Sequence, residues 1–196
     1  MLNQKFSKTQ IILASASPRR RQLLEALDVD FVIKTKNTDE SFGNNTTIRE
    51  IPCQLAQRKA RAFLSEIAEN QLVIAADTIV SIDDEVLNKP QNEQEATTML
   101  QKLSGQCHEV ITGVCLLSLH KEKIFYDVTK VFFKSLTEEE IAYYVKKYKP
   151  YDKAGSYGAQ EWLGMIAIER IEGSYFNVMG LPVHKLYEEL KIFWSN

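Results

Sequence analysis

A carboxylate follows an apolar run in the segment Ala75-Ala76-Asp77-Thr78. The residues from Leu72 to Ala76 are all apolar and predict a buried strand that ends at Asp77. Because a carboxylate removed from water needs a metal ion or a basic side chain beside it, Asp77 is a candidate for metal binding or general-base catalysis. A simple turn formed by Asp77 and Thr78 is the alternative.

A second acidic pair, Asp39-Glu40, lies in the loop after a predicted strand at Phe31–Lys34. The three histidines are scattered, and the three cysteines form no CxxC pair, so neither residue type predicts a zinc site. Carboxylates without His or Cys suit a hard cation such as Mg²⁺ or Mn²⁺. Ordinary loop polarity would also explain this pair.

The segment Ser15-Ala16-Ser17-Pro18-Arg19-Arg20 stands where a strand gives way to a helix. Ser17 is a good N-cap, and Pro18 suits the first helical position. Hydroxyl groups, backbone N–H groups at a helix start and the planar fork of arginine together can hold phosphate, so Ser15, Ser17, Arg19 and Arg20 are candidate ligands of an anion. A capped helix with surface arginines is the alternative.

Three lysines occupy constrained places. Lys59 lies on a predicted helix, Lys89 precedes Pro90 and is therefore held extended, and Lys153 lies in the two-glycine loop Asp152-Lys153-Ala154-Gly155-Ser156-Tyr157-Gly158. We expect the glycines to let the backbone approach a ligand. Each lysine taken alone could equally be a solvated surface residue.

The composition of the 196 residues is that of an ordinary globular domain, with 44% hydrophobic and 26% charged residues. A net charge of -2 argues against a non-specific partner such as DNA or RNA. No apolar run reaches the roughly 18 residues of a membrane span, and the N-terminus lacks the apolar stretch of a secretory signal. We therefore expect a cytoplasmic protein with reduced cysteines.

Strand-like and helix-like segments alternate, which predicts a mixed α/β fold with a mixed sheet. Capping boxes predict helices after Asn92 and Thr137. The other expected elements are strands at Ile11–Ala14, Leu72–Ala76, Ile79–Ile82, Val110–Leu119, Ile124–Phe133 and Met165–Ile171, and helices after Ser17, at Ile51–Ala68 and at Leu181–Phe193.

Taken in order, these segments resemble the Maf family of nucleotide pyrophosphatases. The matching stretches are LASASPRRRQLL, the acidic pair, LAQRKA, AADTIV, NKP, LSG, TGV, DKAGSYGAQ and EGSYFNVMGLP. The resemblance implies one domain over residues 1–196, with an elongated mixed sheet of the Maf and inosine-triphosphatase type, flanking helices and a cleft between two lobes. It also implies a homodimer, a divalent cation and cleavage between the α and β phosphates.

Within that family, the branch that acts on dTTP and UTP is similar to this chain at three positions, Arg19, Thr78 and Gln160, which the resemblance makes specificity residues. Asp77 matches the family's proton acceptor. The branch that acts on 7-methyl-GTP typically has Trp after Ser-Pro and Gln after the Asp. Ala159 departs from the family pattern, because many members have a larger aliphatic residue before the Gln. The segment Gln160-Glu161-Trp162 is also bulkier than the glycine-rich version of this loop.

These matches lead to a hypothesis for the reaction. Glu40 and Asp77 hold Mg²⁺ or Mn²⁺, and Asp77 takes a proton from water. Arg19, Lys59 and Lys89 hold the triphosphate, with Arg20 and Lys153 as further candidates, and Gln160 reads the base edge with support from Thr78. Modified pyrimidine nucleotides are expected substrates on the same argument.

Two other functions stay open at this point. The chain could hydrolyse another non-standard nucleotide, such as inosine triphosphate or 7-methyl-GTP. Alternatively it could bind a nucleotide as a regulator of septum formation, since members of the family are linked to arrest of cell division. A dual role is compatible with the pyrimidine pyrophosphatase.

Overall fold

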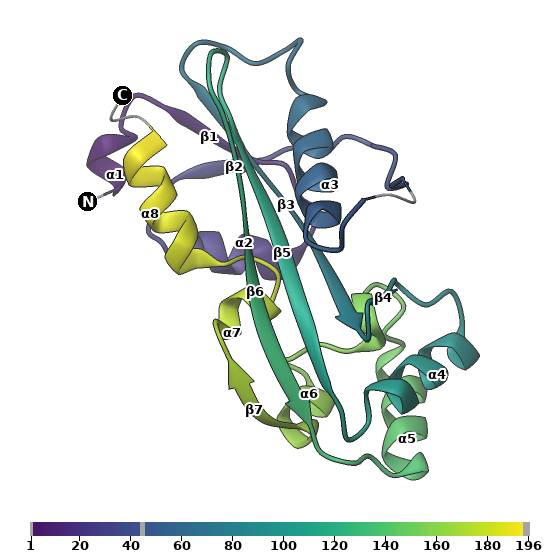
Figure 1. Cartoon of the computed structure of the whole chain (residues 1–196). Helices are drawn as coiled ribbons and strands as arrows, with labels where there is room; N and C mark the ends of the chain where they lie inside the picture. The colour runs from purple at the N-terminus through teal and green to yellow at the C-terminus, as the bar shows by residue number, and fades with distance from the viewer. Residues whose placement is uncertain (1, 44–45, 194–196) are drawn as a thin grey trace. The chain divides into compact units, whose positions relative to one another are not determined.

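The computed structural model describes residues 2–43 and 46–193 (Figure 1). It confirms the mixed α/β class, because helices alternate with the strands of a seven-stranded mixed sheet. The strands are β1 (Gln10–Leu13), β2 (Phe31–Ile33), β3 (Gln71–Ile82), β4 (Glu85–Leu87), β5 (Cys107–Leu117), β6 (Glu122–Phe133) and β7 (Ile168–Glu172). The helices are α1 (Leu2–Lys5), α2 (Pro18–Glu25), α3 (Glu50–Arg61), α4 (Glu93–Leu103), α5 (Glu138–Tyr148), α6 (Trp162–Ala167), α7 (Tyr175–Val178) and α8 (Val183–Phe193), with a 3-10 turn η1 at Ala154–Ser156.

Hydrogen bonding orders the strands β2-β1-β3-β5-β6-β7, with β4 paired to β3. Strand β1 runs parallel to both β2 and β3, whereas β4 is antiparallel to β3 and β7 is antiparallel to β6. The turn between β3 and β4 is the expected one, because Asp83 and Asp84 both adopt positive φ, as in a type I′ hairpin turn.

The chain divides into two compact units. Unit 1 comprises residues 1–77, 112–127 and 180–196, and unit 2 comprises residues 78–111 and 128–179. Strands β3, β5 and β6 contribute residues to both units. The expected single domain with a cleft between two lobes stays a prediction.

In unit 1, helix α3 packs against one face of β1, β3 and β5 (Figure 1). Ala56 and Ala60 of α3 are fully buried against residues such as Ala75. Gly113 on β5 makes this close approach possible, because a Cβ atom there would lie 2.4 Å from the backbone of Pro52 and Cys53. The small residues thus place the helix directly on the sheet.

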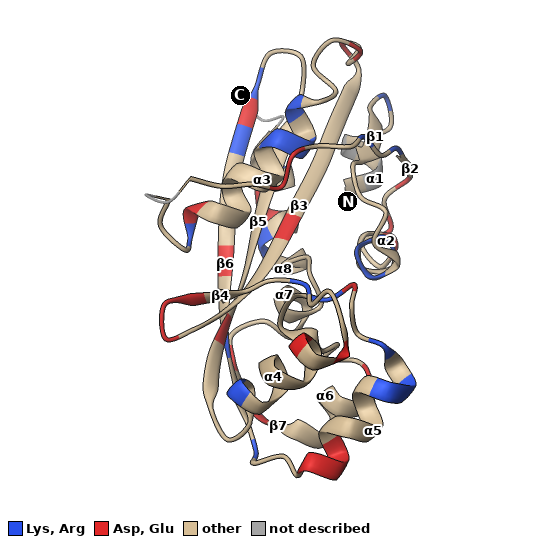
Figure 2. Ribbon diagram, turned by 90° about the vertical axis from the view of Figure 1, so that its right-hand side faces the viewer, with Lys and Arg blue, Asp and Glu red and all other residues tan. Residues whose placement is uncertain are grey.

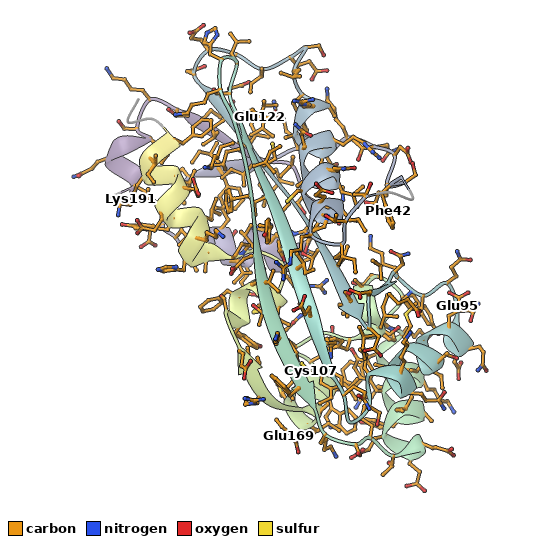
Figure 3. The ribbon with its side chains drawn as sticks, viewed as in Figure 1. Phe42, Glu95, Cys107, Glu122, Glu169 and Lys191 are labelled. Carbon is orange, nitrogen blue, oxygen red and sulfur yellow. The ribbon has the colours of Figure 1, made fainter. Side chains whose placement is uncertain are left out.

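Helix α3 is also held by an ionic contact with strand β6. Glu122, labelled in Figure 3, accepts hydrogen bonds from Arg61 at 2.9 and 2.7 Å and from Gln57 at 2.9 Å. These bonds lower the pKa of the Glu122 carboxyl, with the Arg61 contact as the main cause. The side of α3 that carries Gln57 and Arg61 is therefore fixed along the sheet.

In unit 2, helices α4 and α5 enclose the core with the ends of β3, β5 and β6. Both begin where the capping signals predict. Asn92 accepts from the amide of Glu95, and Thr137 and Glu140 make both bonds of a capping box. Acidic residues at the start of α5 and lysines at its end complement the helix dipole (Figure 2).

Helix α3 and strand β7 differ in extent from their predictions. Helix α3 ends at Arg61 instead of Ala68, because the amides of Phe63, Leu64 and Glu66 bond carbonyls three residues back in tight turns. The Ala62 carbonyl accepts a hydrogen bond from Lys36 Nζ at 2.9 Å. The expected strand at Met165–Ile171 begins at Ile168. The preceding residues form α6, where Leu163 and Ala167 are buried at helical spacing while Met165 is exposed.

Among the described residues, no helix is both long and apolar enough to cross a membrane.

Candidate active site

Asp77 lies in the middle of β3, not at its end, so the prediction of a strand ending there is wrong. The apolar pattern resumes with Ile79 and Val80, both of which are buried, and the strand continues to Ile82. The Asp77 side chain is only 13% exposed, and a basic partner compensates its charge. A charged residue can therefore stand inside this strand without ending it.

That partner is Lys59 on α3. Its ammonium contacts Asp77 Oδ1 and lies 2.9 Å from Glu40 Oε1. The structure therefore brings together three of the predicted site residues, namely the two proposed metal ligands and a proposed phosphate ligand. Since one nitrogen touches both carboxylates, Glu40 and Asp77 point at a common place within unit 1.

Arg58 holds the loop that carries Glu40 by bonding the residues directly before and after Glu40. Its Nη1 donates to the carbonyl of Asp39 at 2.6 Å and to the carbonyl of Ser41 at 2.7 Å. The Asp39 carboxylate accepts from the Ser41 hydroxyl and amide, and these bonds lower the Asp39 pKa. Asp39 therefore shapes the loop that runs on to Phe42 (Figure 3), while Glu40 reaches Lys59.

Sequence reasoning missed Arg58. The residue is part of the stretch LAQRKA and directly precedes Lys59. No periodicity or spacing marks it, because its partners are backbone carbonyls of a loop 17 and 19 residues earlier in the chain. The only sequence signal for this contact is the opposite charge of Arg58 and Asp39. Their charged groups form a weak ion pair, with Arg58 Nη1 3.6 Å from Asp39 Oδ2.

The start of α2 forms as predicted. Ser17 caps the helix by accepting from the Arg20 amide at 3.4 Å, and Ser15 Oγ accepts from the Ser17 amide at 3.2 Å. Arg20 Nη1 donates to Ser15 Oγ at 3.4 Å, and its Nε donates to the Gly180 carbonyl at 2.8 Å. The hydroxyls thus fix Arg20 and the helix start. Arg19 is partly exposed in the first turn of the same helix.

Burial and the nearby carboxylates shift the pKa of Arg20 in opposite directions, and burial is the larger effect. Burial lowers the pKa of its guanidinium, and Asp77 and Glu40 raise it. Both carboxylates are close enough to act on Arg20 electrostatically, so the basic group at the start of α2 belongs to the same charged cluster as Lys59. This cluster combines two carboxylates with two positively charged side chains, namely Glu40, Asp77, Arg20 and Lys59.

Four predicted site residues belong to unit 2. Thr78 follows Asp77 in β3, and successive side chains of a strand leave opposite faces. Lys89 is exposed just after β4. Lys153 is buried beside Asp152 and Glu161. The side-chain oxygen of Gln160 is buried and has no hydrogen-bond partner among the described residues.

The glycines of the 152–158 loop have packing roles in the structure. Gly155 adopts a φ of 67°, and a Cβ there would lie 3.0 Å from the Val80 side chain. A Cβ at Gly158 would lie 2.8 Å from the carboxyl carbon of Glu161. Both glycines therefore let side chains of unit 2 pack against the loop.

The side chains around Lys59 include two carboxylates that a divalent cation could use as ligands. The described residues contain no group of three or more acidic, histidine or cysteine side chains placed to hold a metal ion. Mg²⁺, however, is usually bound through one or two carboxylates, with substrate phosphates and water as its other ligands. Glu40 and Asp77, which converge on one Lys59 nitrogen, fit that mode of binding.

Nearly the whole chain is similar to known proteins. Residues 10–193 match the family described as Maf-like protein. The dTTP/UTP pyrophosphatase of Bacteroides fragilis is 53% identical over 187 residues, which cover 95% of this chain and 97% of that protein. The dTTP/UTP pyrophosphatase of Parabacteroides distasonis is 50% identical over 191 residues, which cover 97% of this chain and 99% of that protein.

Among solved structures, the Ham1 protein of Staphylococcus aureus is similar to 64% of this chain and to 72% of its own chain. Its TM-score is 0.46 and its sequence identity is 14%.

Proposed function

The chain belongs to the Maf family, and we propose that it hydrolyses dTTP and UTP to the nucleoside monophosphate and pyrophosphate. Its relatives of that name support the substrate, and the matched length extends over nearly all of both chains. The observation that carries the reaction is the convergence of Glu40 and Asp77 on Lys59. Acidic groups beside a triphosphate would repel it unless a cation intervened, so this arrangement favours catalysis over binding alone.

Asp77 acts as the proton acceptor. Its carboxylate is mostly buried and is held by Lys59, and it interacts electrostatically with Arg20. From this position it orients a water molecule toward the α phosphorus and takes a proton from it. Glu40 and Asp77 would hold Mg²⁺ or Mn²⁺, which when bound supplies charge neutralisation and acidifies water.

The basic residues hold the triphosphate. Arg19 and Arg20 at the start of α2 present guanidinium groups next to a helix N-terminus, with Ser15 and Ser17 fixing that turn. Lys59 and Lys89 stabilise negative charge that develops on the departing pyrophosphate.

Gln160 selects the base, with support from Thr78. Uracil and thymine present the same edge, in which one N–H group lies between two carbonyls, and an amide side chain can both donate and accept. We expect weak discrimination between dTTP and UTP, because the thymine methyl group contributes only about 1–3 kcal/mol in a pocket. Modified pyrimidine nucleotides with the same edge are substrates on this argument.

Product analysis in ¹⁸O-labelled water tests which bond breaks. The proposal predicts pyrophosphate and a monophosphate that carries one ¹⁸O atom, since water attacks the α phosphorus. Release of inorganic phosphate and a nucleoside diphosphate would contradict it. The expected homodimer, the cytoplasmic location and the link with arrest of cell division stay predictions.

A further inference from the structure

Lys153 is a buried charge with two acidic partners. Its side chain is 9% exposed, and its ammonium lies 2.7 Å from Asp152 Oδ1 and 3.1 Å from Glu161 Oε1. A buried ammonium is costly unless it is paired, and Glu161, at 22% exposure, is the more buried of the two partners. The ion pair therefore ties the beginning of the 153–161 loop to its end.

Tyr144 on α5 binds the same end of this loop. Its hydroxyl donates to Glu161 Oε2 and accepts from the Gly158 amide at 3.3 Å. Tyr144 is fully buried, and the neighbouring Glu161 raises the pKa of its hydroxyl further after burial itself. Both oxygens of Glu161 are thus engaged, one by Lys153 and the other by Tyr144.

Gln160 lies between these anchored positions. Ala159 before it is buried, Gly158 is bonded to Tyr144, and Glu161 after it makes the two contacts just described. The Gln160 side-chain oxygen is shielded from water, yet it has no hydrogen-bond partner among the described residues. A buried acceptor left unpaired is unfavourable, so a ligand that donates an N–H group there would remove that cost.

We propose that Glu161, with Tyr144 and Lys153, is a positioning residue that holds Gln160 so that its side-chain oxygen accepts a hydrogen bond from the imide N–H of a uracil or thymine base. This inference rests on the proposed function. It gives Lys153 an internal role in the loop instead of a phosphate contact. It also gives a reason for the bulk of this segment compared with the glycine-rich version of the loop, since the Glu161 side chain bonds both Lys153 and Tyr144.

UTP and CTP provide the sharpest comparison, because they share the ribose and triphosphate and differ at the base edge. Cytosine has no N–H group at the ring position where uracil has its imide proton. Loss of correct positioning should therefore lower kcat/KM for UTP and leave kcat/KM for CTP unchanged. A merely structural role would lower both values together.

The experiment measures the ratio of kcat/KM for UTP to that for CTP in Tyr144→Phe, Glu161→Gln and Gln160→Ala. Tyr144→Phe removes one hydroxyl, and we expect the ratio to fall about tenfold, the effect of one hydrogen bond. Glu161→Gln keeps the size of the side chain and should also lower the ratio. The matched control is Tyr148→Phe, which removes a hydroxyl from the ring stacked on Tyr144 at a centroid distance of 4.9 Å and should leave the ratio unchanged.

A double-mutant cycle then separates positioning from general damage. In the Gln160→Ala background, Tyr144→Phe should not change the ratio further, because the group that it positions is gone. An unchanged ratio in both Tyr144→Phe and Glu161→Gln would overturn the inference, and so would an equal fall with and without Gln160. If the wild-type protein itself does not prefer UTP over CTP, the proposed function fails first, and the inference fails with it.

Discussion

The ammonium of Lys59 contacts the carboxylate of Asp77, which lies 18 residues further along the chain. The contact exists because α3 lies directly on the sheet, with fully buried alanines such as Ala56 and Ala75 in the shared core. Glu40 joins the same nitrogen from a loop. Any change that moves α3 or this loop should therefore alter the site.

Asp77→Asn should remove most of the turnover and leave folding intact. The amide has nearly the same shape as the carboxylate but cannot take a proton, so we expect kcat to fall by at least about 10²-fold. Steady-state kinetics and thermal unfolding measure the two effects. The control is Asp30→Asn at an exposed position, and near-normal turnover in Asp77→Asn would refute the assignment of Asp77.

Arg58→Ala should weaken metal binding more than it weakens the fold. The variant frees the carbonyls of Asp39 and Ser41, so Glu40 loses its fixed backbone. We expect weaker Mn²⁺ binding by calorimetry, a higher metal requirement for activity and faster proteolysis in the loop.

The matched control for this loop is Arg61→Ala. Arg61 lies on the same helix but bonds Glu122 instead of the loop. An equal loss of Mn²⁺ affinity in both variants would show that the helix as a whole, and not the grip on the loop, is responsible.

Gly113→Ala should destabilise unit 1 and reduce activity together. The new methyl group would lie 2.4 Å from the backbone of Pro52 and Cys53, so α3 would have to move away from β5. Overpacking of this kind costs about 1–3 kcal/mol, which urea unfolding can measure. Gly43→Ala is the control, because its Cβ would meet only Thr46 at an ordinary 3.7 Å.

Local signals in the sequence were enough to predict the helix starts, because a capping bond joins residues only three apart, as between Thr137 and Glu140. They were not enough for Asp77. An acidic residue after an apolar run predicts the end of a strand, and only the distant Lys59 explains why β3 continues. Arg58 and the pairing of Glu161 were missed for the same reason, since their partners are remote in sequence.

His108 should make the fold sensitive to acid. Burial lowers the pKa of its imidazole from 6.5 to about 4, and its Nε2 lies 2.7 Å from the Tyr157 hydroxyl. The unfolded chain therefore binds a proton that the folded chain does not, so stability falls as the pH drops from 6.5 to about 4. The full loss is about 3 kcal/mol.

His108→Gln provides the comparison for this pH dependence, because glutamine does not titrate. The difference in the free energy of unfolding between wild type and variant should shrink between pH 7 and pH 4. Parallel curves over that range would show that His108 does not titrate differently in the folded and unfolded chains.

Metal-dependent hydrolysis of dTTP and UTP is the reaction that we propose for this site. Its most direct test is the rate of pyrophosphate release from dTTP, UTP, CTP, GTP, inosine triphosphate and 7-methyl-GTP, each with Mg²⁺ or Mn²⁺ and with an EDTA control. We predict release from dTTP and UTP at similar kcat/KM, much slower release from the purine nucleotides, and none with EDTA. A purine nucleotide hydrolysed as fast as dTTP, or no release from any triphosphate, would contradict the account.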